Sequence, residues 1–161
     1  MNNLPSIYAN NIIEWGDWES IRITHLELQK LLYLFFARFA YLSKVSGENE
    51  LIPFDECPVR WQNGPVFVSV YHNFKKHGSQ PVSIYRNDDG SISKVMKTDE
   101  RFRKAFFDVI KLYGTQTASF LVGLTHGDII ENYETAWEKA AHNQPLSLDD
   151  IVEDGRVFFA A

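Results

Sequence analysis

The chain has only one cysteine, Cys57, so it cannot close an intramolecular disulfide bond. Since nothing in its cysteine content points to an oxidising compartment, we expect a cytoplasmic protein. The first residues also lack the basic stretch, apolar run and small-residue cleavage site of a secretory signal. The longest apolar run, residues 31–43, contains Arg38 and is shorter than the ~17 to 25 residues that span a bilayer. We therefore expect no membrane partner.

Motifs that carry catalysis or bind a cofactor are missing as well. There is no Gly-x-Ser-x-Gly elbow and no glycine-rich phosphate loop. Cys57 stands between Glu56 and Pro58, where no neighbouring cation would lower the pKa of its thiol. The histidines have no metal-binding spacing, since His72 and His77 are five residues apart and do not share a helical face. The sequence thus predicts no catalytic residue, no metal, no cofactor and no enzyme.

Basic residues are outnumbered, with 16 Lys and Arg against 21 Asp and Glu and a net charge of −5. This balance argues against binding of a phosphate backbone as the main role, and we expect no nucleic-acid partner. The alternative is a DNA-binding helix-turn-helix, which a helical domain of this size can host. The DNA-binding surface of such a helix-turn-helix would be a cluster of basic residues, which Asp99 and Glu100 interrupt. The members of that cluster are Lys94, Lys97, Arg101, Arg103, Lys104 and Lys111.

What the chain does contain is ample material for one packed core. Of its 161 residues, 45% are hydrophobic and 14% are aromatic, which suits a single domain of ordinary size. The order of apolar periodicities and turn signals predicts a mainly α (α+β) fold over residues 1–161. We expect a helical bundle around a central apolar helix, with a small β-hairpin or short antiparallel sheet.

The central helix has the clearest start signal in the sequence. Residues 24–27, Thr-His-Leu-Glu, match a capping box, in which Thr24 and Glu27 satisfy each other's free amide groups. Apolar residues then occur on most sides of the helix as far as Leu42, and a helix of this kind is covered on most sides. We therefore place it in the middle of the bundle.

Proline and glycine mark the neighbouring boundaries. Pro5 suits the first turn of a helix over residues 5–15, which Gly16 would end in a left-handed cap. The turn Asn63-Gly64-Pro65 is expected to lead into a third helix, with Pro65 at its first position.

The other segments follow from composition and alternation. Two prolines restrict residues 51–61 to short edge strands. Alternating side chains at residues 82–85 and 91–95 predict a β-hairpin. Thr98, which two acids follow, is expected to begin a helix that Gly114 ends. Further helices are expected at residues 116–124, 132–142 and 148–158, the last capped by Ser147.

Two polar features are not explained by core packing. Gln29 and Lys30 interrupt the apolar helix near its start. Trp61 precedes a rigid Gly-Pro turn at an expected helix N-terminus, where free backbone amides would bind a carboxylate or a partner's chain. The alternative is that Trp61 fills the core and that Asn63 merely caps the third helix.

These features belong to a longer pattern with a fixed order. It comprises residues 23–33 (ITHLELQKLLY), residues 61–66 (WQNGPV), Val70-Tyr71 with residues 75–78 (KKHG), residues 121–126 (LVGLTH) and residues 137–140 (WEKA). The pattern resembles the Panacea domain, also called the SocA-like or phage-associated protein family. The resemblance covers nearly the whole chain.

Members of that family are antitoxins of bacterial and phage toxin–antitoxin systems, and they neutralise toxins by direct contact. The resemblance therefore implies an antitoxin-like module whose partner is a cognate toxin. The alternative is a proteolytic adaptor or phage-associated interaction protein that delivers a client protein to a protease, as one branch of the family does. The residues that the resemblance marks as signature or partner-binding positions are Gln29, Lys30, Tyr33, Trp61, Asn63, Gly64, Pro65 and Tyr71.

Two further hypotheses concern the C-terminal part, where residues 128–161 hold eight acids and two bases. The acids Glu131, Glu134 and Glu138 would complement a basic toxin surface. An uncharacterised hydrolase would use His126, oriented by Asp128, or a site near Trp61.

Overall fold

Helices form most of the chain in a computed structural model, which describes residues 4–96 and 99–160. The mainly α class with a small antiparallel sheet is confirmed. Along the chain the elements are α1 (Pro5–Trp18), α2 (His25–Val45), β1 (Val59–Trp61), β2 (Gly64–Val66), α3 (Val68–Phe74), the 3-10 helix η1 (Lys75–His77), α4 (Glu100–Tyr113), α5 (Ala118–His126), α6 (Ala136–Lys139) and α7 (Leu148–Val157). Within the described ranges, none of these helices combines the length and apolarity that a bilayer crossing demands.

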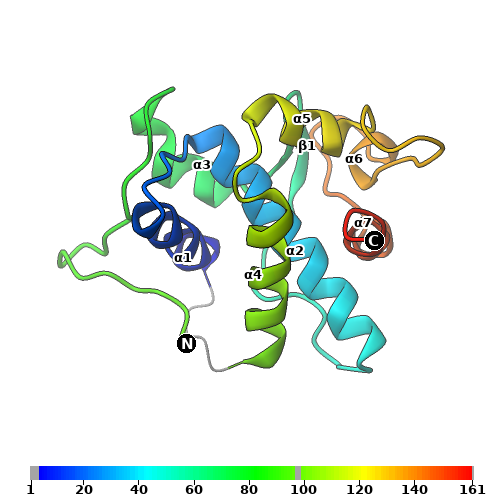
Figure 1. The fold of residues 1–161 in the computed structure, drawn as a ribbon, viewed down its shortest axis with the longest axis horizontal. Coiled ribbons are helices and arrows are strands. Elements are labelled where there is room, and N and C mark those ends of the chain that lie inside the picture. Colours follow the sequence, from blue (N-terminus) through cyan, green and yellow to red (C-terminus); the bar gives the residue numbers. More distant parts are fainter. Residues whose placement is uncertain (1–3, 97–98, 161) are drawn as a thin grey trace.

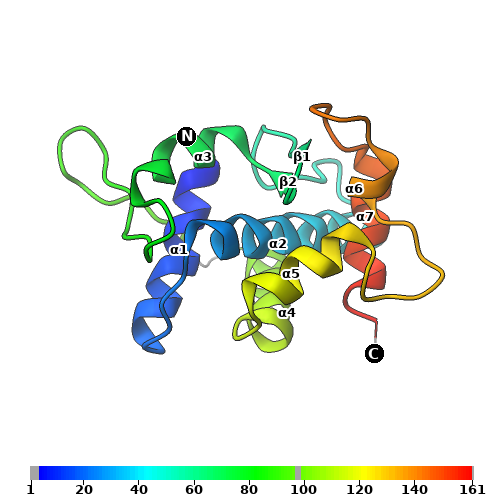
Figure 2. The ribbon, with the colours of Figure 1, turned by 90° about the horizontal axis from the view of Figure 1, so that it is seen from above.

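Helix α2 runs through the middle of the molecule, with α1 crossing one end and α7 lying near the other (Figures 1 and 2). It packs against α1, α3, α4, α5, α7 and β2. Residues 28–37 are buried without interruption, so nearly three turns are covered on every side. The expected capping box is present, since Glu27 N donates to Thr24 Oγ1 over 3.3 Å and Thr24 N donates to Glu27 Oε1 over 3.0 Å.

Strands β1 and β2 form a tight antiparallel hairpin in which Trp61 pairs with Gly64. The prediction that Pro65 begins the third helix is therefore wrong, because Pro65 lies inside β2 and α3 begins at Val68. Gly64 adopts a φ of +115°, which the helical conformation excludes and which favours glycine. Asn63 stands in the hairpin turn, so it does not cap α3 either.

The hairpin expected at residues 82–85 and 91–95 is not built as a strand ladder. A single bridge joins Arg86 to Ile92. Two buried asparagines of α1 take up the backbone groups that a ladder would use. Asn10 bonds to the N–H and C=O of Tyr85, and Asn11 bonds to both backbone groups of Val95. The alternating pattern thus identified a half-buried extended segment and missed its side-chain partners.

Several helix ends differ from the sequence expectation. Helix α1 continues through Gly16 to Trp18, and Gly16 instead gives room to Ile23, whose Cδ1 would lie 2.7 Å from an added Cβ. Helix α4 begins after Asp99, whose carboxylate accepts from the amides of Arg101 and Phe102. Thr98, the expected first cap, lies outside the described residues.

The later helices are shorter than expected or begin later. Helix α5 starts after Thr117, and α6 covers only four residues because a capping box formed by Thr135 and Glu138 starts it late. Helix α7 lies where it was predicted, but the Ser147 side chain at its N-cap makes no capping hydrogen bond.

Helices α2 and α7 cross in direct backbone contact. A Cβ added at Gly155 would lie 2.0 Å from the carbonyl oxygen of Ala37. Arg38 reinforces the crossing, since its NH1 donates to the Gly155 carbonyl over 3.0 Å and its Nε to Asp108 of α4 over 2.8 Å. Only glycine allows the two helices to approach this closely.

We expect Gly155→Ala to lower the free energy of unfolding by about 3 kcal/mol, because the new methyl group meets rigid backbone. Urea unfolding followed by circular dichroism measures this. Gly123→Ala in α5 is the matched control, since its added Cβ would meet only ordinary contacts at 3.5 Å and beyond. That variant should gain up to about 1 kcal/mol from helix propensity. Equal effects of the two changes would contradict the close crossing.

Candidate functional site

A surface pocket of about 310 Å³ lies where the hairpin meets the start of α2 and helix α3. We call it the Trp61 pocket. Five of the eight residues expected at the site line it, namely Gln29, Lys30, Trp61, Asn63 and Tyr71. The other lining residues are His25, Leu26, Gln62, Val66 and Gly78. A larger hollow of about 570 Å³ lies beside α1 and residues 93–96 and 99–102, but no expected site residue lines it.

Aromatic rings form part of the wall of the Trp61 pocket. The rings of Trp61 and Tyr71 meet edge to face with centroids 5.0 Å apart, and His25 lies 5.6 Å from Tyr71 on the other side. All three side chains are half-buried. The alternative that Trp61 fills the core is therefore wrong, because it presents part of its surface to solvent beside the pocket.

Gln29 fixes the hairpin to α2, because its side-chain amide bonds to both backbone groups of one residue, as a neighbouring strand would. Its Oε1 accepts from the backbone N–H of Phe67 over 3.0 Å, and its Nε2 donates to the carbonyl of the same residue over 3.1 Å. The expected free amides after the turn are thus partly used within the chain. A carboxylate of Glu56 accepts from the Ser69 amide in the first turn of α3. Two of the amides near this helix N-terminus are therefore occupied within the chain.

Lys30 is completely buried, and its Nζ donates to the carbonyl of Pro65 over 2.8 Å. Burial in this poorly solvated place lowers its pKa to about 7. No carboxylate of the described residues lies within ion-pair distance of this amine. Gly64 makes room for the side chain, since a Cβ there would lie 2.8 Å from Lys30 Cε. Gly64 and Pro65 thus belong to the site as the backbone that holds Lys30.

His126 lies close to this region, but it forms no catalytic couple. Its ring stacks on Trp137 with centroids 3.9 Å apart, and its Nε2 is buried without a hydrogen-bond partner in the described chain. Burial is the largest cause that lowers its pKa; Asp128 opposes the shift and Lys30 adds to it. No hydrogen bond joins His126 to Asp128 among the described contacts, so the geometry adds no support to the hydrolase hypothesis.

Arg60 is a residue that the sequence pattern did not single out. Its guanidinium lies 4.0 Å from the centre of the Trp137 ring, and its NH1 donates to carbonyls at the end of α6, including that of Ala140 over 2.7 Å. Trp137 Nε1 in turn donates a hydrogen bond to the Trp61 carbonyl over 2.7 Å. These contacts hold α6 against the hairpin. They join residues about 80 positions apart, so the local sequence around either residue does not predict them.

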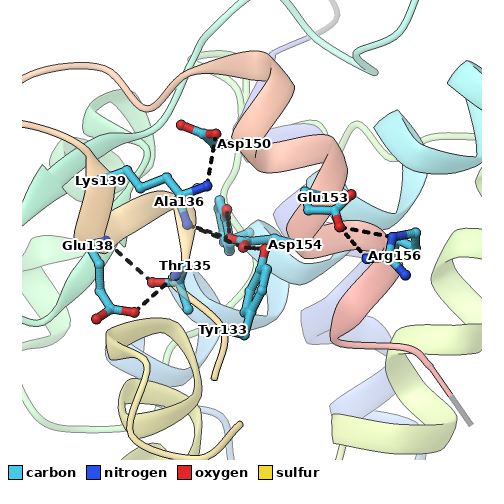
Figure 3. Close-up of polar contacts among 10 residues, drawn as sticks. Tyr133, Thr135, Ala136, Glu138, Lys139, Asp150, Glu153, Asp154 and Arg156 are labelled. Atoms are coloured by element: carbon cyan, nitrogen blue, oxygen red, sulfur yellow. Dashed lines mark hydrogen bonds and ion pairs between the residues drawn. The ribbon is translucent and has the colours of Figure 1, made fainter. Parts of the chain in front are cut away.

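Tyr33 is expected at the site but does not line the Trp61 pocket. It is fully buried, and its hydroxyl donates to Asp154 Oδ2 over 2.5 Å. Asp154 also accepts from the Tyr133 hydroxyl and from the Ala136 amide, as Figure 3 shows. The role of Tyr33 is therefore a structural hydrogen bond between α2 and α7.

Other candidate groups are dispersed. Within residues 4–96 and 99–160, no three His, Cys, Asp or Glu side chains are placed to hold a metal ion. Cys57 is exposed, and desolvation followed by the nearby acids raises the pKa of its thiol. Much of the basic cluster is engaged in ion pairs, formed by Lys94 with Glu14, Arg101 with Asp99 and Lys104 with Asp108. Lys97 lies outside the described residues.

A scan against protein-family models, a search of curated proteins and a search of solved structures each find no match for this chain. The Panacea resemblance therefore stays a prediction from the sequence pattern. The function has to be inferred from the residues of the site.

The Asp154 carboxyl makes stability depend on pH. Burial, its largest influence, raises its pKa from 3.8 to about 6, although the tyrosine hydrogen bonds act in the opposite direction. Between these two pKa values the folded chain binds more protons than the unfolded chain. The stabilisation from protonated Asp154 is thus complete below pH about 4 and is lost as the pH rises through about 6.

We expect Tyr33→Phe to cost roughly 2 kcal/mol above pH about 7, where Asp154 is charged and loses a charge-assisted hydrogen bond. The cost should shrink below pH about 5, where the lost bond is a neutral one. Urea unfolding across this pH range measures both values. Tyr8→Phe is the control, since its hydroxyl donates to the neutral Pro53 carbonyl and its loss should not vary with pH. A cost that stays constant for Tyr33→Phe would contradict this role of Asp154.

Proposed function

We propose that this chain is an antitoxin-like module that binds a cognate toxin in the cytoplasm and blocks it by direct contact. The observation that carries the proposal is the Trp61 pocket. Its lining comes from three separate stretches of the Panacea-like pattern, at residues 25–30, 61–66 and 71–78. Residues that are distant in sequence and share one open pocket are typical of a binding site.

The chemistry of the pocket favours protein binding. Trp61 and Tyr71 are half-exposed, and tryptophan and tyrosine are the side chains that most often dominate the energy of protein interfaces. The two rings contact each other, and Trp137 Nε1 holds the backbone carbonyl of Trp61, so little side-chain entropy is lost when a partner covers the rings. A pocket of this size suits one anchoring side chain of a partner.

The acidic segment between α5 and α6 offers a second contact. It projects from the molecule in Figure 1, and Glu131 and Glu134 are exposed. We include it in the proposal as the surface that complements a basic region of the toxin. Glu138 is not free for this role, because its carboxylate accepts from the Thr135 amide in the capping box of α6. Charge reversal should therefore be confined to Glu131 and Glu134.

The proposal is tested by co-expression with each neighbouring reading frame of the genome. One frame should be toxic alone and harmless with this chain, and the two proteins should co-purify. Trp61→Ala should weaken binding by about 2 kcal/mol, or roughly 30-fold, because it removes an aromatic anchor. Trp18→Ala is the control, since Trp18 is 83% exposed and lies outside the pocket.

Two results would contradict the proposal. One is that no neighbouring frame is toxic or binds the chain. The other is that Trp18→Ala abolishes binding while Trp61→Ala leaves it intact, which would place the binding surface elsewhere. The half-life of the toxin in the same cells separates the two modes of action. A half-life that the chain leaves unchanged supports occlusion, whereas a shortened one supports delivery to a protease.

A further inference from the structure

The Trp61 pocket is lined by one lysine, Lys30. Lys30 and Gln29 are buried, whereas Gln62, Asn63 and Gly78 at the rim are exposed. The Lys30 ammonium group has three N–H donors. Only one acceptor, the Pro65 carbonyl, is bonded to it among the described residues. Two donors of a fully buried cation are therefore left for another group.

No acidic side chain of the described residues forms an ion pair with Lys30. No Asp or Glu is among the residues that line the pocket. The titratable groups around Lys30 are His25 on its own helix, His126 from α5 and Tyr71 from α3. Burial is the main cause that lowers the pKa of both histidines, and the charge of Lys30 lowers both further, whereas Asp128 raises the pKa of His126. The pocket thus has a positive potential that an anion would balance.

The walls restrict which anion fits. Trp61, Tyr71 and Leu26 offer aromatic and apolar surface in the same pocket. A suitable ligand therefore carries a carboxylate and an apolar group close together. The last residue of a polypeptide carries both on one unit, and the pocket volume of about 310 Å³ can take such a unit. An internal Asp or Glu would bring the carboxylate but would leave the aromatic walls uncovered.

We propose that the Trp61 pocket binds the C-terminal residue of the partner protein, with its carboxylate on Lys30 and its apolar side chain against Trp61 and Tyr71. This inference rests on the proposed protein-binding function and specifies the part of the partner that is gripped. The exposed amides of Gln62 and Asn63 at the rim are available to the preceding peptide group. The carboxylate would also relieve the cost of burying an unpaired ammonium group.

Peptide binding to the full chain provides the test. The probes are acetylated tripeptides Ac-Gly-Gly-X, in which X is each of the standard amino acids, prepared with a free carboxylate or a C-terminal amide. Peptides with an apolar X should bind in the acid form and at least about tenfold more weakly as the amide. Equal binding of both forms, or binding by no acid, would overturn the inference. A small acid such as 4-methylpentanoate that binds as tightly as the peptides would overturn the assignment to a chain end.

Two lysine variants separate the pocket from general charge effects. Lys30→Met should lose at least about tenfold in affinity for the acid peptides. Lys75→Met is the matched control, because Lys75 is exposed and its Nζ lies 6.0 Å from the Tyr71 ring. It should keep the wild-type affinity to within about twofold. Equal losses in the two variants would show a diffuse charge effect and contradict a specific contact.

The pH dependence gives a signature that is specific to Lys30. Its pKa is about 7 in the free chain and rises when a carboxylate binds, so the affinity should fall by up to about tenfold per pH unit above pH 7. Burial lowers the pKa of His25 and of His126, so their titrations move away from the pH range of this fall. Lys30→Met should show no such fall, and a flat wild-type profile would count against the inference.

One measurement on the wild-type chain does not depend on the folding of a variant. The pH titration of the Lys30 side chain, followed by NMR, should move to a higher pKa when the acid peptide saturates the chain. An unchanged titration would refute the contact. If a toxin binds and Trp61→Ala releases it while no acid peptide binds, the inference fails and the proposed function stands. If acid peptides bind while no neighbouring frame is toxic, the proposed function fails and the pocket assignment stands.

Discussion

The burial of polar side chains on α2 is the constraint on which the rest of the structure depends. Gln29, Lys30 and Tyr33 lie on a helix that is covered on every side, and each must find a hydrogen-bond partner there. A buried donor or acceptor without a partner costs about 1–3 kcal/mol. Gln29 and Lys30 bind the backbone at Phe67 and Pro65, and Tyr33 binds a carboxylate of α7. The polar residues thus fix both the hairpin and α7 to α2.

The Trp61 pocket follows from the same bonds. Because Gln29 and Lys30 hold the chain just after the hairpin turn, Trp61 stands beside α3 and meets the edge of Tyr71. Trp137 binds the Trp61 carbonyl from the other side and keeps the hairpin in place. The scaffold and the proposed binding site therefore share residues. Lys30 has both roles, since the buried amine that anchors β2 also gives the pocket its charge.

Features that depend on residues close together in the sequence could be predicted, whereas features that depend on distant residues could not. The start of α2 could be predicted because Thr24 and Glu27 are three residues apart and cap each other. Pro65 was placed in a helix because its local sequence suits a first turn, whereas its position in β2 depends on pairing with β1. The expected hairpin near Tyr85 failed for a related reason. Asn10, 75 residues away, supplies the hydrogen bonds that a paired strand would have given.

Local chemistry alone was sufficient for the class of fold and the central place of α2, and it drew attention to Gln29, Lys30 and Trp61, which line one pocket. The other expected lining residue, Tyr71, came from the family resemblance. Apolar periodicity and helix caps act over a few residues, so a single sequence records them. The separation of Tyr33 from that group and the contribution of Arg60 required the folded chain. Tyr33 bonds to a residue 121 positions away, and Arg60 to carbonyls about 80 positions away. Contacts of this kind depend on how distant segments pack, and no local propensity encodes them.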